Sequence, residues 1–385
     1  MKNIFPFIFI LINTAAYSQT IIPDISARVD TSKTVIKSVY HLYKNYINSK
    51  PDSIYKNPYW NDKEADQLLK SKIFKIDRSA NQMYNYYNSV QYLSYYTPKI
   101  LQIDSIASNR YQIKTLFAHD CAEKEYKNST PDFITKLYAV KNENEEFKLE
   151  NVISYDTKNW KKYKAKFITY IVHPNCSFDK KEAVKAVRFC EKIANQFNLK
   201  IEPFTYYILP NSDEMGKLYN FEYWLSYLGG QALIPYKEIF TTYGNASYPH
   251  EFVHMLFPLP KDNSLYCPMI INEGLATWLA GPSFNESFED SLKQTSKTFQ
   301  KQKGISLDDI MTFKFRNDFD NSILYVTGGV ICKLVYEKHG EKGIWELYNS
   351  TKDNFNVTLE KLFEKPFDDV EKMIIKYITD YDNAK

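Results

Sequence analysis

The chain has 385 residues, of which 44% are hydrophobic, 25% charged and 16% aromatic, with 11 glycines and 16 prolines. This length predicts two domains or one large one, and the composition excludes a disordered, collagen-like or low-complexity chain. The 49 basic and 46 acidic residues leave a net charge of +3 without a basic cluster, so no nucleic-acid partner is expected.

The first 19 residues have the order of features that is typical of a secretory signal peptide. Lys2 supplies the positive charge, residues 4–12 are mainly apolar, and small residues precede an expected cleavage site near Ser18. The apolar stretch is shorter than the roughly 20 residues that span a membrane. We therefore expect a secreted or periplasmic protein without stable membrane insertion; the alternative is an uncleaved N-terminal anchor.

Residues 20–155 predict a small α+β domain. Apolar residues at helical spacing indicate helices over residues 31–48 and 62–72, whereas the Tyr- and Asn-rich residues 82–96 favour no element. Strands are predicted at residues 99–105, 110–117, 133–140 and 146–154. No catalytic motif lies in this region, which we interpret as a packing or binding module of unknown role.

Residues 160–282 begin with a strand, a helix and a second strand. Strongly β-forming residues predict the strands at 167–172 and 204–209. Between them, Ser177 can accept a hydrogen bond from the first turn of an amphipathic helix that continues to Phe197.

Residues 231–241 predict a further strand. Pro235 restricts it to a sheet edge or a bulge, because proline cannot donate to the hydrogen-bond ladder. Helical sequence follows from about Asn245 and continues through residues 283–385, which we expect to be a helical C-terminal part of the same unit.

Five cysteines in an exported chain permit disulfides without requiring them. Cys190 and Cys332 lie on apolar helical faces and are expected to be buried free thiols. Any bridge is expected to join two of the other three, Cys121, Cys176 and Cys267. None of the five has the spacing of a thiolate zinc site.

Residues 248–254 read YPHEFVH and contain the pattern HExxH. Residues four apart lie on one face of a helix, so His250 and His254 can offer two imidazole nitrogens to one cation. Glu251 projects about 100° around the helix from His250, where it can reach a water on the metal without being a ligand. Two core or solvated histidines are the structural alternative.

A second motif, IINEGLATW at residues 270–278, follows, and eighteen residues separate His254 from Glu273. Together the two motifs resemble those of the gluzincin metallopeptidases, the group that contains thermolysin and the aminopeptidase-type zinc enzymes. The resemblance implies that His250, His254 and Glu273 bind one zinc ion per chain and that Glu251 is the general base. It is specific at these motifs and loose elsewhere.

The expected fold class is therefore α+β: a small N-terminal α+β domain, a gluzincin-type catalytic domain with a mixed sheet and active-site helices, and a helical C-terminal part. Two imidazoles and one carboxylate leave an open fourth position on zinc, where the pKa of a water falls towards 7. Glu251 can take a proton from that water and pass it to the leaving amine.

A donor for the oxyanion is expected downstream. In the aminopeptidase-type enzymes a tyrosine at a helix start supplies it, and residues 324–330, LYVTGGV, resemble that segment. We therefore predict that Tyr325 is catalytic; a core tyrosine is the alternative. His339 before Gly340 is typical of a helix C-terminus and is expected to be structural. The remaining histidines have no ligand spacing: His41, His119 and His173.

The sequence also departs from the family. Aminopeptidases of the group carry a glutamate for the substrate amine on a strand before HExxH, but residues 229–233 read GGQAL, and Glu238 is only a weak substitute. Thr277 stands where thermolysin-like enzymes have an acidic residue, so the partner of a ligand histidine must come from elsewhere. Pro249 is tolerated only in a first helical turn, so we expect the helix to begin between residues 245 and 247.

The sequence thus predicts an exported zinc metallopeptidase that acts on peptide or protein substrates, with internal cleavage favoured because the amine anchor is missing. Three alternatives stay open: a non-catalytic binding or scaffold protein on the same frame, an aminopeptidase, and a zinc hydrolase of a non-peptide bond. Retention of Glu251 argues against the scaffold, because metal ligands alone do not need a base. No sequence feature indicates an oligomeric state.

Overall fold

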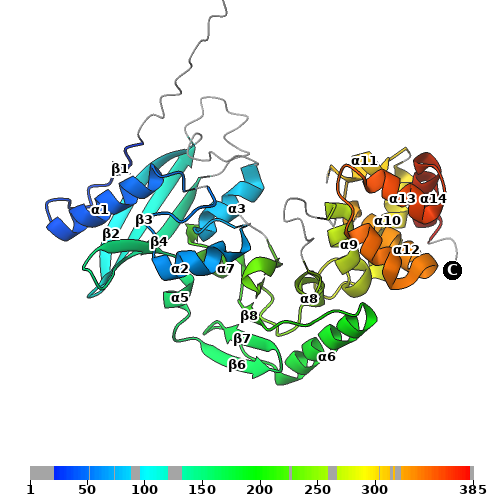
Figure 1. Cartoon of the computed structure of the whole chain (residues 1–385), viewed down its shortest axis with the longest axis horizontal. Helices are drawn as coiled ribbons and strands as arrows, with labels where there is room; N and C mark the ends of the chain where they lie inside the picture. The colour runs from blue at the N-terminus through cyan, green and yellow to red at the C-terminus, as the bar shows by residue number, and fades with distance from the viewer. Residues whose placement is uncertain are drawn as a thin grey trace, which may run out of the picture.

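The computed structural model describes residues 21–51, 53–72, 74–87, 96–119, 132–224, 228–258, 267–302, 304–312, 315–316 and 322–381. The expected signal peptide and Cys121 lie outside these ranges. The fold is a mixed α+β arrangement of two mixed sheets and a helical C-terminal region, in that order along the molecule (Figure 1). No helix in the described ranges is long and apolar enough to cross a membrane.

The first sheet has the strand order β1-β2-β3-β4-β5. Its strands are β1 (Asp24–Ile25), β2 (Tyr96–Ala107), β3 (Arg110–His119), β4 (Phe133–Lys141) and β5 (Phe147–Glu150). The helical elements of this region are α1 (Thr34–Ile47), α2 (Asp62–Leu68), η1 (Leu69–Ser71) and α3 (Arg78–Tyr87). Apolar residues of α1, among them Val39 and Tyr43, share one buried cluster with Ile103 and Ile113 of the sheet.

The strand expected over residues 146–154 ends early, at Glu150. The next two backbone N–H groups donate to side chains instead of a strand: that of Asn151 to Glu64 at 3.0 Å and that of Val152 to Asn220 at 3.0 Å. The chain then turns into the short helix α5 (Ile153–Asp156). These two polar side chains, which are distant in sequence, therefore end the ladder.

A strand from much later in the chain also joins the first sheet. β9 (Phe221–Tyr223) follows α7 (Ser212–Leu218) and pairs antiparallel with β4. Behind this pairing, aromatic side chains of both sheets share one buried cluster, including Phe117 and Phe133 from the first and Tyr207 and Phe240 from the second. The two sheets are thus joined by a common core.

The second sheet has the strand order β10-β11-β8-β7-β6, in which β7, β8 and β11 run parallel and the two edge strands run antiparallel to them. Its strands are β6 (Lys161–Ala165), β7 (Ile168–Val172), β8 (Phe204–Ile208), β10 (Gly230–Leu233) and β11 (Glu238–Thr241). Helix α6 (Lys180–Gln196) connects β7 to β8. Its cap is Asp179 and not the expected Ser177, because the Asp179 carboxylate accepts from the N–H groups of Lys181 and Glu182.

The single strand expected over residues 231–241 is wrong; the segment is a hairpin. Gln231 pairs with Phe240 across β10 and β11, and the short 3-10 helix η3 (Ile234–Tyr236) connects them. Pro235 has no N–H for a ladder, and Lys237 adopts a left-handed φ of 54°, which reverses the chain. The strand at the sheet edge is therefore β10.

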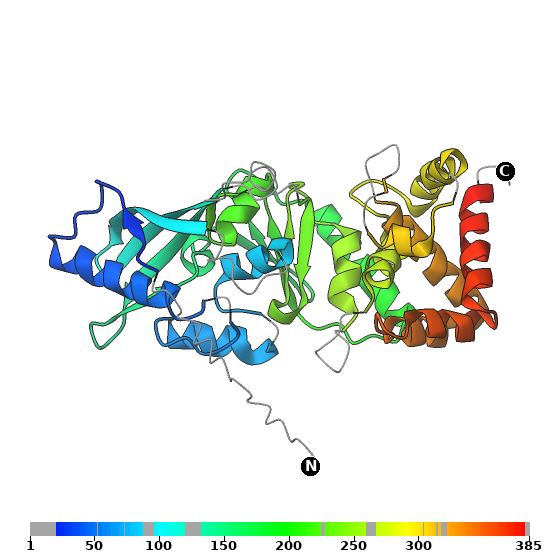
Figure 2. The same cartoon turned by 90° about the horizontal axis from the view of Figure 1, so that it is seen from above.

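The C-terminal region is helical, as predicted. Its helices, coloured yellow-green to red, gather at the end opposite the N-terminal sheet (Figure 2). They are α8 (Pro249–Leu256), α9 (Met269–Ala280), α10 (Phe288–Lys301), α11 (Leu307–Ile310), α12 (Ile323–Tyr348), α13 (Phe355–Phe363) and α14 (Phe367–Asp380). Inside α12, Gly340 has non-helical angles, and the preceding His339 bonds the Leu362 carbonyl through Nε2 at 2.6 Å, which fits its expected structural role.

The described cysteines are free thiols. Cys190 and Cys332 are buried, which confirms the prediction for both. Cys176 and Cys267 are not bridged to each other.

Candidate metal centre

Helix α8 carries the HExxH pattern and begins at Pro249, later than expected. Residues 245–247 form a turn instead, in which the Asn245 side chain accepts from the N–H of Ser247 at 2.7 Å. Tyr248 is the extended N-cap, and Pro249 occupies the first helical position, where no N–H is needed. Phe252 and Val253 are fully buried against the second sheet and its helices, so the helix is held firmly.

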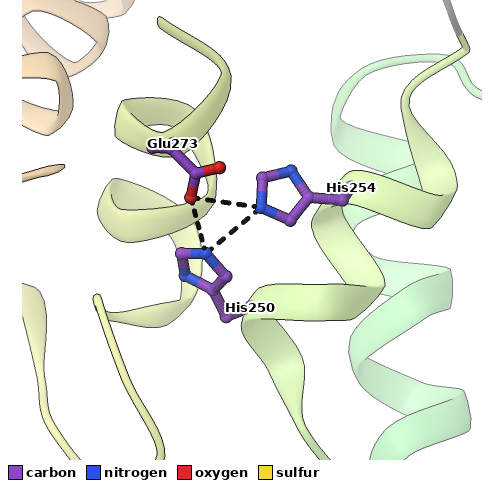
Figure 3. Close-up of side chains that lie close together, drawn as sticks. All are labelled: His250, His254 and Glu273. Carbon is purple, nitrogen blue, oxygen red and sulfur yellow. Dashed lines mark hydrogen bonds and ion pairs between the residues drawn. The ribbon is translucent and has the colours of Figure 1, made fainter. Parts of the chain in front are cut away.

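Helix α9 carries the third candidate ligand. Its apolar residues, including Ile270, Ile271 and Leu275, are buried in the same cluster as the core of α8. The helix ends at Gly281, whose φ of 90° suits a residue without a side chain. This packing places Glu273 directly opposite the two histidines of α8 (Figure 3).

His250, His254 and Glu273 form one compact group, as predicted (Figure 3). Glu273 Oε2 lies 3.2 Å from His250 Nε2 and 3.5 Å from His254 Nε2, and the two Nε2 atoms are 3.2 Å apart. Two ligand atoms on tetrahedral zinc, each at about 2.0–2.1 Å, are roughly 3.3 Å apart. The three atoms therefore have the mutual spacing of ligands around one zinc ion, and the donor set fits that metal.

The tautomer of His250 is set by a backbone group. Its Nδ1 lies 2.8 Å from the carbonyl oxygen of Gly281. A carbonyl can only accept, so Nδ1 carries the proton and the lone pair of Nε2 points into the group. The Gly281 carbonyl is thus the hydrogen-bond partner that orients His250. Thr277, which is fully buried one turn earlier on α9, does not have this role.

The group is buried, and its charges depend on one another. Burial alone would raise the pKa of Glu273, but the imidazoles of His254 and His250 bring it well below its usual range. Burial would lower the pKa of His254, but the facing Glu273 carboxylate raises it to about 9. At neutral pH His254 therefore holds a proton against the Glu273 carboxylate, and a cation bound by the three ligand atoms would displace that proton.

Glu251 lies beside this group without belonging to it. Its side chain is buried, and burial raises the pKa of the carboxyl, although the nearby imidazoles offset part of the rise. The backbone of Ala232 in β10 lies close to the Glu251 carboxylate and lowers its pKa slightly. A Cβ on Gly230 would meet the Tyr248 ring at 2.5 Å and Glu251 Cγ at 3.1 Å. Small residues on β10 thus let this strand approach Glu251 closely.

Tyr325 also lies at the site. Its ring centroid is 6.1 Å from that of His250. Burial, and then the carboxylates of Glu273 and Glu251, raise the pKa of Tyr325 well above its usual range, so the phenol keeps its proton. The hydroxyl is therefore a donor at neutral pH.

A close helix contact sets the position of Tyr325. Helices α9 and α12 meet at two glycines: a Cβ on Gly274 would lie 2.2 Å from the backbone carbon of Gly328. Gly274 directly follows Glu273, and Gly328 is one turn beyond Tyr325. The missing side chains allow the two backbones to approach, which brings the tyrosine and the carboxylate to the same site.

The other histidines stay apart from this group. His173 Nε2 lies 3.3 Å from a Glu214 carboxylate oxygen, and His41 packs against Tyr40. The side chain of His119 lies outside the described residues.

The Gly281 carbonyl is the partner of His250 that the sequence motifs did not predict. Every residue has a backbone carbonyl, so no residue type marks the one that accepts this hydrogen bond.

Loss of either histidine ligand should abolish tight zinc binding. We expect about one zinc per purified chain, measured by inductively coupled plasma mass spectrometry, and less than about one tenth of that in His250→Ala and His254→Ala. His173→Ala is the matched control, since it also removes a buried histidine with a carboxylate partner, and it should keep its zinc. Full zinc occupancy in both ligand variants would place the metal elsewhere.

A comparison of this chain with models of known protein families finds no match, and a comparison with curated proteins finds no similar sequence.

Proposed function

We propose that this chain is an exported zinc-dependent peptidase of gluzincin type that cleaves internal peptide bonds. The observation that carries the proposal is the triangle of His250, His254 and Glu273, with Glu251 buried beside it. A structural zinc site would have a fourth protein ligand. Among the described residues, the potential metal-ligand cluster contains these three only.

The roles of the residues follow from their positions. Zinc, when bound, would supply a Lewis acid that lowers the pKa of a water and polarises the scissile carbonyl. Glu251 accepts the proton of the water and passes it to the leaving amine, for which its raised pKa is suited. The Tyr325 hydroxyl donates to the oxygen that becomes negatively charged.

Among the described residues no strand pairs with the outer edge of β10, and this free edge is suited to hold an extended peptide. The N–H of Thr242 donates to the Gly229 carbonyl at 2.9 Å, which makes these residues a hydrogen-bonded pair of the hairpin. The alternation of an antiparallel ladder then directs the N–H and C=O groups of Gly230 and Ala232 away from β11. Because the Ala232 N–H faces Glu251, the backbone groups of Gly230 and the Ala232 carbonyl are those that can add a substrate strand, and such binding reads the backbone and tolerates many side chains.

The position of Glu238 supports internal cleavage. An aminopeptidase must neutralise the α-ammonium of its substrate, and Glu238 was the remaining candidate on this hairpin. Its carboxylate instead forms two hydrogen bonds with Arg78, at 2.8 and 3.0 Å, on the sheet face opposite Glu251. A paired carboxylate on that face is not available to a substrate amine.

Glu251→Gln should retain the fold and the zinc while kcat on a cleaved peptide falls by about 100-fold or more. The amide is close in shape to the carboxylate but cannot accept the proton of the water. The measurement is cleavage of casein or of a peptide library by mass spectrometry, with zinc content determined on the same sample. Activity near that of the unaltered protein would remove Glu251 from the mechanism.

Tyr325→Phe should lower kcat by about 100-fold, with little change in KM or zinc content. Only the hydroxyl is removed, so the packing of the ring against His250 is preserved. Steady-state kinetics on one peptide separate the two constants. Tyr336→Phe, on the same helix, is the control and should leave kcat unchanged. An unaltered kcat in Tyr325→Phe would make Tyr325 a packing residue.

Internal cleavage can be tested with two peptides that differ only in a free or an acetylated N-terminus. We expect equal cleavage of both at internal bonds, because no free carboxylate stands ready for the amine on the described part of the β10–β11 hairpin. Product masses give the cleaved bond. Stepwise loss of N-terminal residues from the free peptide alone would instead identify an aminopeptidase.

A further inference from the structure

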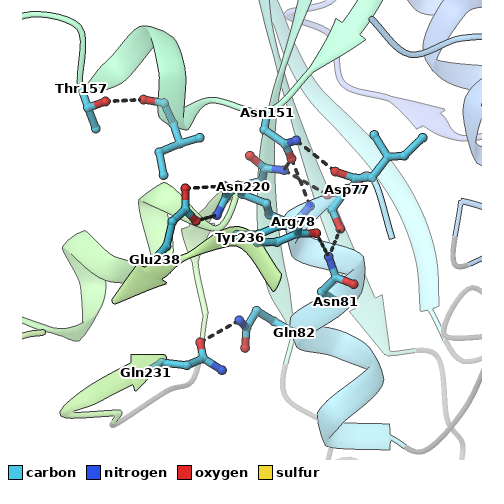
Figure 4. A network of polar contacts seen from close by, with 12 residues as sticks. Asp77, Arg78, Asn81, Gln82, Asn151, Thr157, Asn220, Gln231, Tyr236 and Glu238 are labelled. Carbon is cyan, nitrogen blue, oxygen red and sulfur yellow. Dashed lines mark hydrogen bonds and ion pairs between the residues drawn. The ribbon is translucent and has the colours of Figure 1, made fainter. Parts of the chain in front are cut away.

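The hairpin that supplies the free edge strand has two different faces. Gly230 and Ala232 are on the face towards α8 and Glu251. Side chains alternate along a strand, so their neighbours Gln231 and Leu233 are on the opposite face. That opposite face is covered by the N-terminal region (Figure 4).

Arg78 at the start of α3 makes a bidentate ion pair with Glu238 of β11, 160 residues later in the chain. The exposed fractions of the two side chains are 5% and 14%, so water does not screen the pair. The Arg78 guanidinium also lies over the Tyr236 ring, 5.0 Å from its centroid. Removal of either partner would leave a buried charge without compensation, which is strongly unfavourable.

Gln82, one helical turn after Arg78, extends this contact to the edge strand itself. Its Nε2 donates to Gln231 Oε1 of β10 at 3.0 Å, and the Gln82 side chain is buried (Figure 4). Between the two strands, the Tyr236 hydroxyl donates to the Lys75 carbonyl at 3.1 Å. The N-terminal region therefore contacts β10, η3 and β11 in turn.

The start of α3 is itself firmly held. Asn220 donates through Nδ2 to Asp77 at 3.0 Å and to Asn151 at 2.6 Å, and Asn151 Oδ1 accepts from the N–H of Arg78 at 3.0 Å. The Tyr46 hydroxyl donates to the other Asp77 oxygen at 2.8 Å. A helix start fixed by buried hydrogen bonds can hold the hairpin in one position.

From these contacts we propose that Arg78 and Gln82 are positioning residues, through which the N-terminal region holds β10 in register with Glu251. The proposal rests on the proposed function for its effect on substrate. If the hairpin moves, the backbone of Ala232 leaves the Glu251 carboxylate and the free edge loses its place beside the site. The region with no catalytic motif of its own thus sets the substrate-binding edge.

The test compares Arg78→Met and Gln82→Leu with Arg110→Met in the full-length, zinc-loaded protein. Arg110 is the matched control, because it forms a similarly enclosed ion pair with Glu150, inside the first sheet. Two readouts are taken: hydrogen exchange of peptides covering residues 228–242, and KM and kcat for a cleaved peptide.

We expect exchange in this segment to accelerate by about tenfold in Arg78→Met and about threefold in Gln82→Leu. KM should rise by similar factors, with a smaller change in kcat and unchanged zinc content. Arg110→Met should lower the stability of the first sheet and leave both hairpin exchange and KM unaltered. Gln82→Leu removes only one neutral hydrogen bond, so it gives a result even if Arg78→Met does not fold.

The proposal is overturned if Gln82→Leu shows the same hydrogen exchange in residues 228–242 and the same KM as the unaltered protein. It is also overturned if Arg110→Met changes both quantities as much as Arg78→Met does, because the effects would then come from a general loss of stability. If no peptide is cleaved by any variant, the proposed function fails, and hydrogen exchange alone still decides whether Arg78 and Gln82 hold the hairpin.

Discussion

A buried carboxylate that faces two imidazoles is the constraint on which the rest of the site depends. Transferring a carboxylate from water into a protein interior is unfavourable by several kcal/mol unless partners compensate for the loss of hydration. Here both Nε2 atoms lie within 3.5 Å of one Glu273 oxygen. The same closeness brings the imidazole nitrogens of His250 and His254 to 3.2 Å from each other, so the three facing atoms need a shared proton or metal cation between them.

The surrounding elements each fix one part of this arrangement. The core of α8 fixes the two imidazoles, and the Gly281 carbonyl selects which nitrogen of His250 faces the group. The contact of Gly274 with Gly328 brings α12 close enough for Tyr325 to join from a third helix. Glu251 comes from the same helix as the two imidazoles, and the strand beside it, β10, belongs to the second sheet. Three helices and one strand thus meet at one point, and each is held by apolar packing away from it.

How much of this was predictable depended on the range of the interactions. The spacing of residues on a helix is local, so the HExxH pattern correctly placed His250 and His254 together. The joining of Glu273 was predictable only through a resemblance, because nothing local brings two helices together. The ends of helices were predicted less accurately. Asp179, and not Ser177, caps helix α6, since the two side chains compete as acceptors for the same N–H groups. The pairing of Arg78 with Glu238 spans 160 residues and leaves no pattern in either segment.

The pairing of β9 with β4 has a consequence for the order of biosynthesis. β4 ends at Lys141, but its partner ends at Tyr223, so the first sheet lacks a strand until 82 further residues have been made. At about 5–20 residues per second, that delay is roughly 4–16 s. The buried aromatic cluster that contains Phe117 and Phe133 is complete only later, when Phe240 has been synthesised. A ribosome-bound chain therefore cannot complete its N-terminal sheet before strands β7 and β8 of the second sheet have been made.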